Sequence, residues 1–379
     1  MNGNTIAANI YFNDDVTYTG TAGSETNPYC IEDFWDLVLV SSYSESTNPF
    51  NLNHTDMYGL FVKDIDMNDY PDITTQIMNG TVTYKYTTYT FTFTSFKLLW
   101  AQIDGAGYCL RNLCVYGNTF KSSTNGIFYK YATAFNLKIK NLNIINFISY
   151  SNNSLFSTSG EGVSSSLTFE KCNFGVYYYN LTNGFIVSLI NSLYILYSKF
   201  EKCTFNFKGS CYYMALLGSP NCSAKPIFNL CHINIDKMNG IGCLFHCASS
   251  ADYTTYGGTY FTYITGRMRN VTTGPTGTAE NTFLVNSIGS SYISPFFNKF
   301  IMNYINVKLE YDKTTTPRVV RIIGSSNIYP SPAPNVINET NLIDGAYPLE
   351  IVNKGDNTNI RHITDTQLKD PVFLNRYRF

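Results

Sequence analysis

The chain has 379 residues and a formal net charge of -1 at pH 7, with 26 lysines and arginines against 27 aspartates and glutamates. This balance predicts neither a basic surface for nucleic acid nor an acidic tail. Only 14% of the residues are charged, whereas tyrosine (31) and phenylalanine (27) are abundant. Aromatic residues favour strands and are scarce in disordered chains, so the composition predicts a folded protein rich in β-structure.

The N-terminal arm, residues 1–27, is mostly polar. Its first residues, Met1 to Ile6, do not show a basic stretch followed by an apolar one, so no secretory signal is expected. No membrane span is expected either, because no run of 18 apolar residues occurs. These features predict synthesis in a cytosol and, where the protein leaves it, a route other than secretion.

A short apolar pattern recurs through the middle of the chain. An apolar residue is followed by others three and five positions later, in copies that begin at Leu110, Ile139, Phe169, Phe200 and Phe228, which are 29, 30, 31 and 28 residues apart. An apolar pair keeps step with these copies, and its members are Ile127-Phe128, Leu155-Phe156, Phe185-Ile186, Leu216-Leu217 and Leu244-Phe245, then the weaker Phe283-Leu284 and Ile322-Ile323.

Two patterns in step predict stacked structural repeats. Each unit is too small to bury its own apolar side and must stack on its neighbours. The segments are rich in Phe, Tyr, Ile and Thr and tend to alternate with period 2, which favours strands over the helices of tetratricopeptide-like repeats. The sequence thus predicts an all-β fold, a right-handed parallel β-helix (solenoid) of about seven coils over residues 28–330.

One position of the repeat carries asparagine twice. Asn112 and Asn141 stand at the same place, followed by Lys171 and Lys202. Equivalent residues of adjacent coils lie about 4.8 Å apart. We therefore expect a side-chain amide ladder between the two asparagines, with two separately solvated residues as the alternative.

The later coils lengthen to steps of 39 residues. We expect the additional residues in loops near residues 251–258 and 274–279, which are rich in Gly and Thr. Loop-borne binding is expected between residues 251 and 290, and Tyr253, Tyr256 and Tyr260 are the candidate binding residues.

Residues 331–379 form a C-terminal extension. The proline-rich segment 329–334 marks the exit from the solenoid. Thr364 and Gln367 fit a capping box for a short helical turn. The terminal segment 373–379 is aromatic and basic, and it either packs on the end of the solenoid or docks to a partner.

The glycine turn Ile103-Asp104-Gly105-Ala106-Gly107 and the strand after it, residues 110–115, resemble an early turn and strand of the pectin-lyase-like parallel β-helix family. Residues 60–66 resemble a preceding first coil. Residues 31–37 resemble the amphipathic helix that caps the open sheet edge of these solenoids. The resemblance covers residues 28–330 and implies the fold with its N-terminal cap, but not an activity, because unrelated functions share this scaffold.

Enzymes of that family are polysaccharide lyases, with clustered aspartates for calcium and a basic residue, or hydrolases, with two or three carboxylates. No aspartate cluster is evident, the Asn-Thr-Asp and Gly-His-Gly motifs are absent, and the only Asp-Asp lies in the N-terminal arm. Glu170 and Glu201 stand at matching repeat positions and are the weak catalytic candidates, with a charged ladder beside Lys171 and Lys202 as the alternative. The missing motifs favour a protein without enzymatic activity.

The ten cysteines form no C-x2-C unit, although Cys109/Cys114 and Cys243/Cys247 have looser zinc-like spacings. Several cysteines fall in apolar, strand-like runs, which predicts buried thiols, with structural disulfides as the alternative. His246 joins Cys243 and Cys247 in one ligand-like cluster. Because these residues flank an apolar pair, we interpret them as core residues and predict no metal and no other cofactor.

A rod with few charges and no secretion signal resembles the fibre, tailspike and head-decoration components of virus particles, best known from bacteriophages. The resemblance implies a virion location after synthesis in the host cytoplasm, with other virion proteins and host-surface glycans as partners. It also implies a homo-oligomer, commonly a trimer. A polysaccharide-degrading tailspike and a bacterial surface adhesin are the alternatives, and a nucleic-acid partner is not expected.

Overall fold

The computed structural model describes residues 24–34, 36–37, 57–72, 74–75, 82–86, 89–93, 96–97, 100–115, 126–131, 136–150, 154–159, 166–193, 197–219, 225–238, 241–247, 259–270, 280–287, 300–311, 319–323, 335–338, 350–351 and 360–363. The arm before residue 24, the loops 251–258 and 274–279, the proline-rich segment 329–334 and the tail after residue 363 lie outside the described residues.

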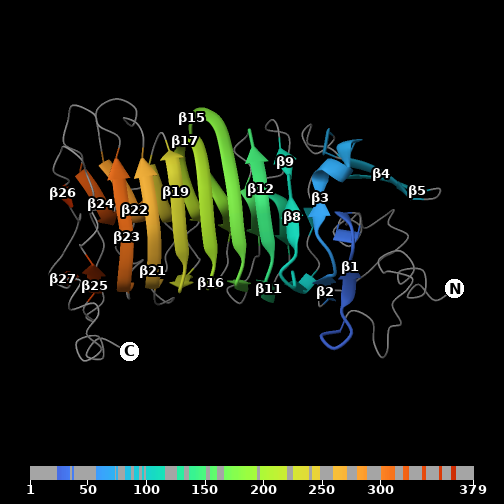
Figure 1. Cartoon of the computed structure of the whole chain (residues 1–379), viewed down its shortest axis with the longest axis horizontal. Helices are drawn as coiled ribbons and strands as arrows, with labels where there is room; N and C mark the ends of the chain where they lie inside the picture. The colour runs from blue at the N-terminus through green and yellow to red at the C-terminus, as the bar shows by residue number, and fades with distance from the viewer. Residues whose placement is uncertain are drawn as a thin grey trace.

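The chain folds as a parallel β-helix, as predicted. Its strands lie side by side along one long axis, from the blue N-terminal end to the red C-terminal end (Figure 1). In the main sheet each strand pairs in parallel with strands of the neighbouring coils. Parallel crossovers of L-amino acids wind right-handed, which is the hand predicted for this chain.

The paired strands form three faces. The first face contains β1 (Tyr29–Ile31), β2 (Met57–Phe61), β7 (Trp100–Asp104), β11 (Asn136–Lys140), β14 (Ser166–Glu170), β16 (Tyr197–Glu201), β18 (Lys225–Asn229) and the first halves of β21 (Thr259–Asn270) and β23 (Phe300–Tyr311). The second face contains β3 (Ile65–Asp66), β8 (Cys109–Arg111), β9 (Cys114–Val115), β12 (Asn143–Ser149), the beginnings of β15 (Asn173–Leu193) and β17 (Thr204–Ser219), β19 (His232–Met238) and the second halves of β21 and β23. The third face contains β6 (Phe96–Lys97), β10 (Gly126–Tyr131), β13 (Ser154–Ser159), the ends of β15 and β17, β20 (Ile241–Cys247), β22 (Glu280–Ser287), β24 (Val319–Ile323) and β26 (Glu350–Ile351).

The apolar repeat fills the interior with columns of stacked side chains. On the first face the column consists of Ile103, Ile139, Phe169, Phe200 and Phe228, in register from strand to strand and at most 3% exposed. The rings of Phe169 and Phe200 stack with centroids 5.5 Å apart, and those of Phe200 and Phe228 at 4.5 Å. Burying one such ring stabilises the fold by roughly 1.5–3 kcal/mol, so these columns hold the coils together.

The second face has a matching inner column. It consists of Leu110, Ile144, Phe174, Phe205 and Ile233, all buried and in register. This register corrects the predicted phase of the repeat, because the residue opposite Ile139 is Ile103 on the first face. The predicted first copy of the pattern, which begins at Leu110, therefore belongs to the next face of the same coil.

The third face corrects the apolar pair in one coil. Ile190 is in register with Phe156 of the coil before and Leu217 of the coil after. The pair of that coil is therefore Leu189-Ile190 and not the predicted Phe185-Ile186. Leu189 and Ile190 are fully buried. The error arose because β15 contains two apolar pairs and a register shift between Leu181 and Ile186.

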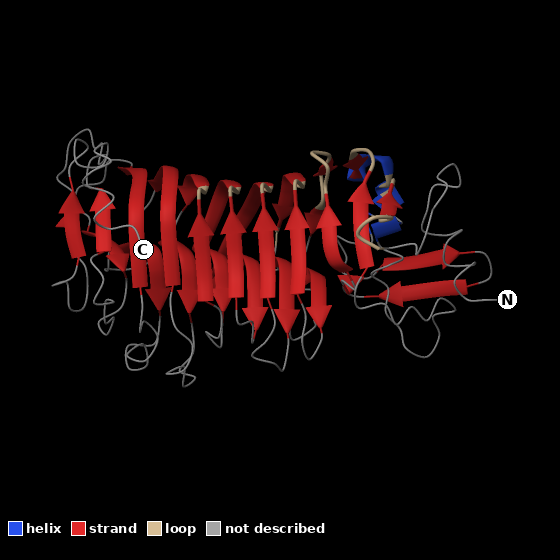
Figure 2. Cartoon of the chain, turned by 90° about the horizontal axis from the view of Figure 1, so that it is seen from below, coloured by secondary structure: helices blue, strands red, loops and turns tan. Residues whose placement is uncertain are grey.

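A short cap covers the N-terminal end of the solenoid, where helical segments (blue) lie in Figure 2. Ile31, predicted to begin the helix, instead ends β1, and helical backbone occurs at Phe34, Asp36 and Leu37. Phe34 and Leu37 are buried, which closes the open end of the core. The 3-10 turn η1 (Met67–Asp69) follows β3.

Two strand pairs lie apart from the main sheet. β4 (Val82–Tyr86) and β5 (Tyr89–Phe93) form an antiparallel hairpin near the N-terminal end (Figure 1). β25 (Asn335–Asn338) and β27 (Ile360–Ile363) form a parallel pair in the C-terminal part. Because β26 pairs with β24, the third face continues beyond residue 330.

Candidate functional site

The solvent side of the first face, here called the first outer face, carries charged residues in register. Asp104, Lys140, Glu170 and Glu201 occupy the same position on successive strands. Glu170 and Glu201 are therefore neighbours on adjacent coils, as the repeat predicted. Their lysine partners, however, are Lys138 and Lys199 rather than the predicted Lys171 and Lys202.

Each of these acids is paired with a base. Lys138 forms a salt bridge with Glu170, Lys199 Nζ lies 3.4 Å from Glu201 Oε2, and Lys140 Nζ lies 3.1 Å from Asp104 Oδ2. The hydrogen bond from Lys138 lowers the pKa of Glu170 below its ordinary value. A general acid at neutral pH needs a raised pKa, so this environment does not favour Glu170 as an acid. Glu170 and Glu201 stay weak catalytic candidates, with the charged ladder as the alternative.

The cysteines of three successive coils form a buried column behind the turn between the first two faces. Cys172, Cys203 and Cys231 are free thiols with at most 2% exposure, and each donates a hydrogen bond to a main-chain carbonyl. The hydrogen bond with Cys172 and burial raise the pKa of Cys203, and burial raises that of Cys231. Because the thiolate is the reactive form, this column is an unreactive part of the core.

The predicted ligand cluster Cys243, His246 and Cys247 lies in β20, with Leu244 and Phe245 between its members. Its side chains lie outside the described residues. Within the described part of the chain, no three His, Cys, Asp or Glu side chains are grouped so that they could hold a metal ion.

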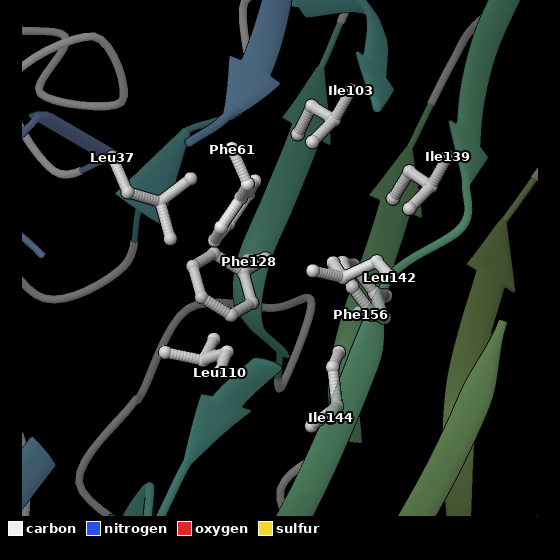
Figure 3. Close-up of a pocket in the computed structure, with 9 residues that line it drawn as sticks. All are labelled: Leu37, Phe61, Ile103, Leu110, Phe128, Ile139, Leu142, Ile144 and Phe156. Carbon is white, nitrogen blue, oxygen red and sulfur yellow. The ribbon is translucent and has the colours of Figure 1, made fainter. Parts of the chain in front are cut away.

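A small cavity lies in the core near the cap, as Figure 3 shows. Its volume is about 10 Å³, and apolar side chains of all three faces line it. Such a space is barely large enough for one water molecule and offers no polar partner, so it is a packing void and not a ligand site. The lining residues are Leu37, Phe61, Ile103, Leu110, Phe128, Ile139, Leu142, Ile144 and Phe156. A ligand therefore has to bind on the outside of this part of the solenoid.

The predicted amide ladder between Asn112 and Asn141 does not form. Asn112 stands one face further on than Asn141, because the phase of the first repeat differs from the predicted one. Asn141 instead donates to Asp104 Oδ1 at 3.0 Å. Asn112 and Asn146 form a ladder of their own, with Asn146 Nδ2 2.7 Å from Asn112 Oδ1 and Asn112 Nδ2 2.8 Å from Asp66 Oδ1.

This first amide ladder runs along a β-bulge on the second face. Asn112 and Asn146 have left-handed backbone conformations, with φ of 61° and 58°, which asparagine adopts more readily than most residues. In β12 the bulge places Ile145 and Asn146 opposite the single residue Gly175 of β15. The ladder ends there, and Asn146 Oδ1 is left as an acceptor without a protein partner in the part of the chain that the structure describes.

A second amide ladder approaches Gly175 from the other side. Asn234 Nδ2 donates to Asn206 Oδ1 at 3.4 Å, and Asn206 Nδ2 donates to Asn173 Oδ1 at 3.2 Å. The ladder ends at Asn173, two residues before Gly175. Among the described residues, no acceptor is bonded to Asn173 Nδ2. One ladder thus ends in an open acceptor and the other in an open donor.

Gly175 leaves a gap in the side chains of this surface. Strand β15 alternates here, with Phe174, Val176 and Tyr178 buried and Asn173, Gly175 and Tyr177 on the solvent side, here called the second outer face. A Cβ atom at Gly175 would lie 3.5 Å or more from its nearest neighbours, so the fold does not require glycine at this position. Glycine within a strand costs stability and often marks a bulge or the close approach of a ligand or of another backbone.

The surroundings of this gap are mostly uncharged and partly apolar. Ile145 is 38% exposed, and Tyr108 and Tyr150, at 37% and 40%, lie beside the two ends of β12. The nearest charged residues in register are Arg111, which is paired with Asp64, and Lys208 beside Tyr177. The second outer face around Gly175 therefore offers amide, aromatic and aliphatic groups with little charge.

The sequence predicted other binding residues, three tyrosines in the later loops. Tyr253 and Tyr256 lie outside the described residues. Tyr260 lies in β21, paired with Ile227 and Ile301, so it is a strand residue and not the predicted loop residue. The one signal for Gly175 in the sequence is a glycine between Phe174 and Val176, inside an apolar strand, and it was overlooked.

No family model matches the chain, and no curated protein and no solved structure matches it either. None of the helical segments in the described ranges combines the length and the apolar composition of a membrane span.

Proposed function

We propose that the protein is a structural component of a virus particle, of the fibre, spike or head-decoration type, that displays a rigid surface to a host glycan. The observation that carries the binding role is the second outer face, where two amide ladders end around Gly175 beside exposed aliphatic and aromatic side chains. Amides donate and accept hydrogen bonds, and aromatic rings stack on the apolar faces of sugars.

The scaffold suits such a role. Stacked coils with interlocking inner columns give a stiff rod, because each coil is held by its neighbours over its whole length. A rigid surface binds with a smaller loss of conformational entropy than a flexible one. The virion location is supported by the resemblance to fibre and spike components, and the same resemblance supports a homotrimer.

The particle assignment is tested by quantitative mass spectrometry of purified virus particles from cells that carry the gene. We expect the chain at a fixed copy number per particle, in a multiple of three for a trimer. Absence of the chain from purified particles that are otherwise complete would contradict the assignment. The glycan-binding role is tested separately by the experiment in the next section.

A further inference from the structure

We propose that the gap over Gly175 on the second outer face is a subsite for a neutral saccharide, bound by the amide groups of Asn146 and Asn173. The proposal rests on the glycan-binding role above and names the place and the chemical class. It commits to one occupant, a sugar ring with two neighbouring hydroxyl groups.

Hydrogen bonding is the first argument. Asn146 Oδ1 can only accept and Asn173 Nδ2 can only donate. Within the described ranges, each is the open end of a ladder whose other members are already bonded to one another. A hydroxyl group both donates and accepts. A pair of neighbouring hydroxyls can therefore donate to Asn146 and accept from Asn173 without bringing any charge to the surface.

The glycine is the second argument. Asn146 of β12 and Asn206 of β17 lie opposite Gly175 on the two neighbouring strands, and Asn173 precedes it by two residues on the same strand. A side chain at Gly175 would therefore stand beside all three amides. Because a Cβ atom there would make only ordinary contacts, packing does not explain the glycine. The bulge at Ile145 and Asn146 turns an extra residue toward the same place, and bulges are frequent next to functional sites.

The charge and apolarity of the side chains around the gap favour one class of ligand. Arg111 is tied to Asp64, which leaves Lys208 as the one charged residue in register beside the gap without a salt bridge among the described residues. One exposed cation attracts a strongly anionic ligand only weakly in the high dielectric of water. Ile145, with its side chain exposed beside the gap, gives the apolar face of a sugar ring a surface to cover.

The test is affinity electrophoresis of the full chain in native gels that contain mannan, dextran or amylopectin, with dextran sulfate as the charged comparator. Two variants probe the gap. Gly175→Thr fills it with a residue that favours strands, and Asn146→Gly removes the acceptor while glycine tolerates the left-handed backbone. Thr168→Val on the first outer face, in register with Lys138 and Lys199, is the matched control. Thermal unfolding and light scattering verify the fold and the oligomeric state of each variant.

We expect at least one neutral polysaccharide to retard the wild-type chain. Gly175→Thr should weaken this binding by about tenfold or more and Asn146→Gly by roughly fivefold, the latter equivalent to one hydrogen bond. Thr168→Val should bind like the wild type. If the wild type binds and both gap variants bind equally well, the subsite is wrong while the glycan-binding role stands.

Three other outcomes would contradict the subsite and, in some cases, the ligand class or the glycan-binding role as well. If no neutral polysaccharide retards the wild type, both the subsite and the glycan-binding role fail. Stronger retardation by dextran sulfate that disappears with added salt would replace the neutral ligand with an anionic one. A change of oligomeric state in Gly175→Thr would identify the gap as a contact between copies of the chain, and would also overturn the subsite.

Discussion

The first and second outer faces belong to the same coils but differ in how their polar groups are satisfied. On the first outer face, Asp104, Glu170 and Glu201 each pair with a lysine of the same sheet. On the second, the amide ladders bond internally but end in an open acceptor at Asn146 and an open donor at Asn173. The inner columns behind both faces are equally apolar and equally buried.

This difference separates what holds the solenoid together from what is offered to a partner. Stacking of the inner columns requires only apolar residues in register, and both faces meet that requirement. This requirement does not fix the outer residues. On the first outer face the acids and lysines form salt bridges with one another, whereas on the second outer face the amide ladders end around Gly175. The comparison predicts that substitutions inside the coils change stability strongly and that substitutions on the first outer face change it little. Substitutions on the second outer face should change ligand binding.

The largest effect is expected for an inner residue. Phe200→Ala removes a fully buried ring that stacks on Phe169 and Phe228. We expect a loss of about 3–5 kcal/mol in the free energy of unfolding, from lost burial and from the cavity left behind. Urea denaturation measures the loss, and Phe205→Ala behind the second face should cost a similar amount. A loss below 1 kcal/mol in either variant would contradict the shared core.

Titration of Asp36 in the cap is expected to change the free energy of unfolding by about 2 kcal/mol. Asp36 lies among acids rather than lysines, and burial, then the negative charges of Asp33 and Glu32, raise its pKa to about 7 in spite of hydrogen bonds from the N–H groups of Glu32 and Asp33. The folded state therefore binds the proton of the Asp36 carboxyl more tightly than the unfolded chain does. The stability that the protonated carboxyl contributes falls as the pH rises from about 4 to about 7.

The variant Asp36→Asn tests this effect. An asparagine retains an acceptor for the same N–H groups but carries no charge, so its stability should not fall over that pH range. Urea denaturation followed by tryptophan fluorescence, at pH 4 to 8, measures both proteins. An equal loss of stability in the variant and the wild type would show that another group titrates. Glu170, whose pKa is lowered by Lys138, contributes the opposite trend, and its share is lost only as the pH falls below its ordinary pKa of 4.5.

A gain of about 0.5–1 kcal/mol is expected at the turn between the two faces. Asn141, Lys171, Lys202 and Leu230 occupy this turn in successive coils, all with left-handed backbone and φ of 53–55°. Leucine adopts this conformation at a cost, and Leu230 is 44% exposed, so it gains little from burial. Leu230→Asn should raise the melting temperature by a few degrees. A lower melting temperature would mean that the leucine makes a contact that matters for stability.

The smallest effect is expected on the first outer face. Glu170→Gln breaks the exposed salt bridge with Lys138, and such pairs contribute at most about 1 kcal/mol. We expect a change below about 0.5 kcal/mol at moderate salt and less at high salt. Denaturation at two salt concentrations measures it. If a host polysaccharide is cleaved by the wild type and not by Glu170→Gln or Glu201→Gln, the pair is catalytic and the structural role proposed for this face fails.

The sequence predicted the fold because the physics of a β-solenoid is repeated along it. Apolar residues that recur at nearly constant steps, such as Phe169, Phe200 and Phe228, must stack if each coil is to bury them. The same logic placed Glu170 beside Glu201. It failed where two faces carry similar patterns, because Leu110 fits the spacing of the first face and the structure places it on the second.

The candidate binding site was harder to predict. It depends on where ladders end, and that depends on the bulge at Ile145 and Asn146, which no pattern of single residues reveals. The predicted Asn112–Asn141 ladder was wrong because a one-face error in phase changed every partner of both residues. The sequence shows a glycine at position 175, but only the structure shows that packing there would leave room for a side chain.

Hydroxyl-radical footprinting tests the central claim, that the second outer face around Gly175 binds a neutral glycan. The exposed side chains of Tyr108, Ile145 and Tyr150 report on the second outer face, and the exposed Leu230, at the turn of a later coil, is the internal control. With the polysaccharide that retards the chain most, we expect Ile145 to lose most of its reactivity, Tyr108 and Tyr150 to lose less, and Leu230 to stay unchanged. Full reactivity of Ile145 in the bound state, or protection of Leu230 alone, would contradict the claim.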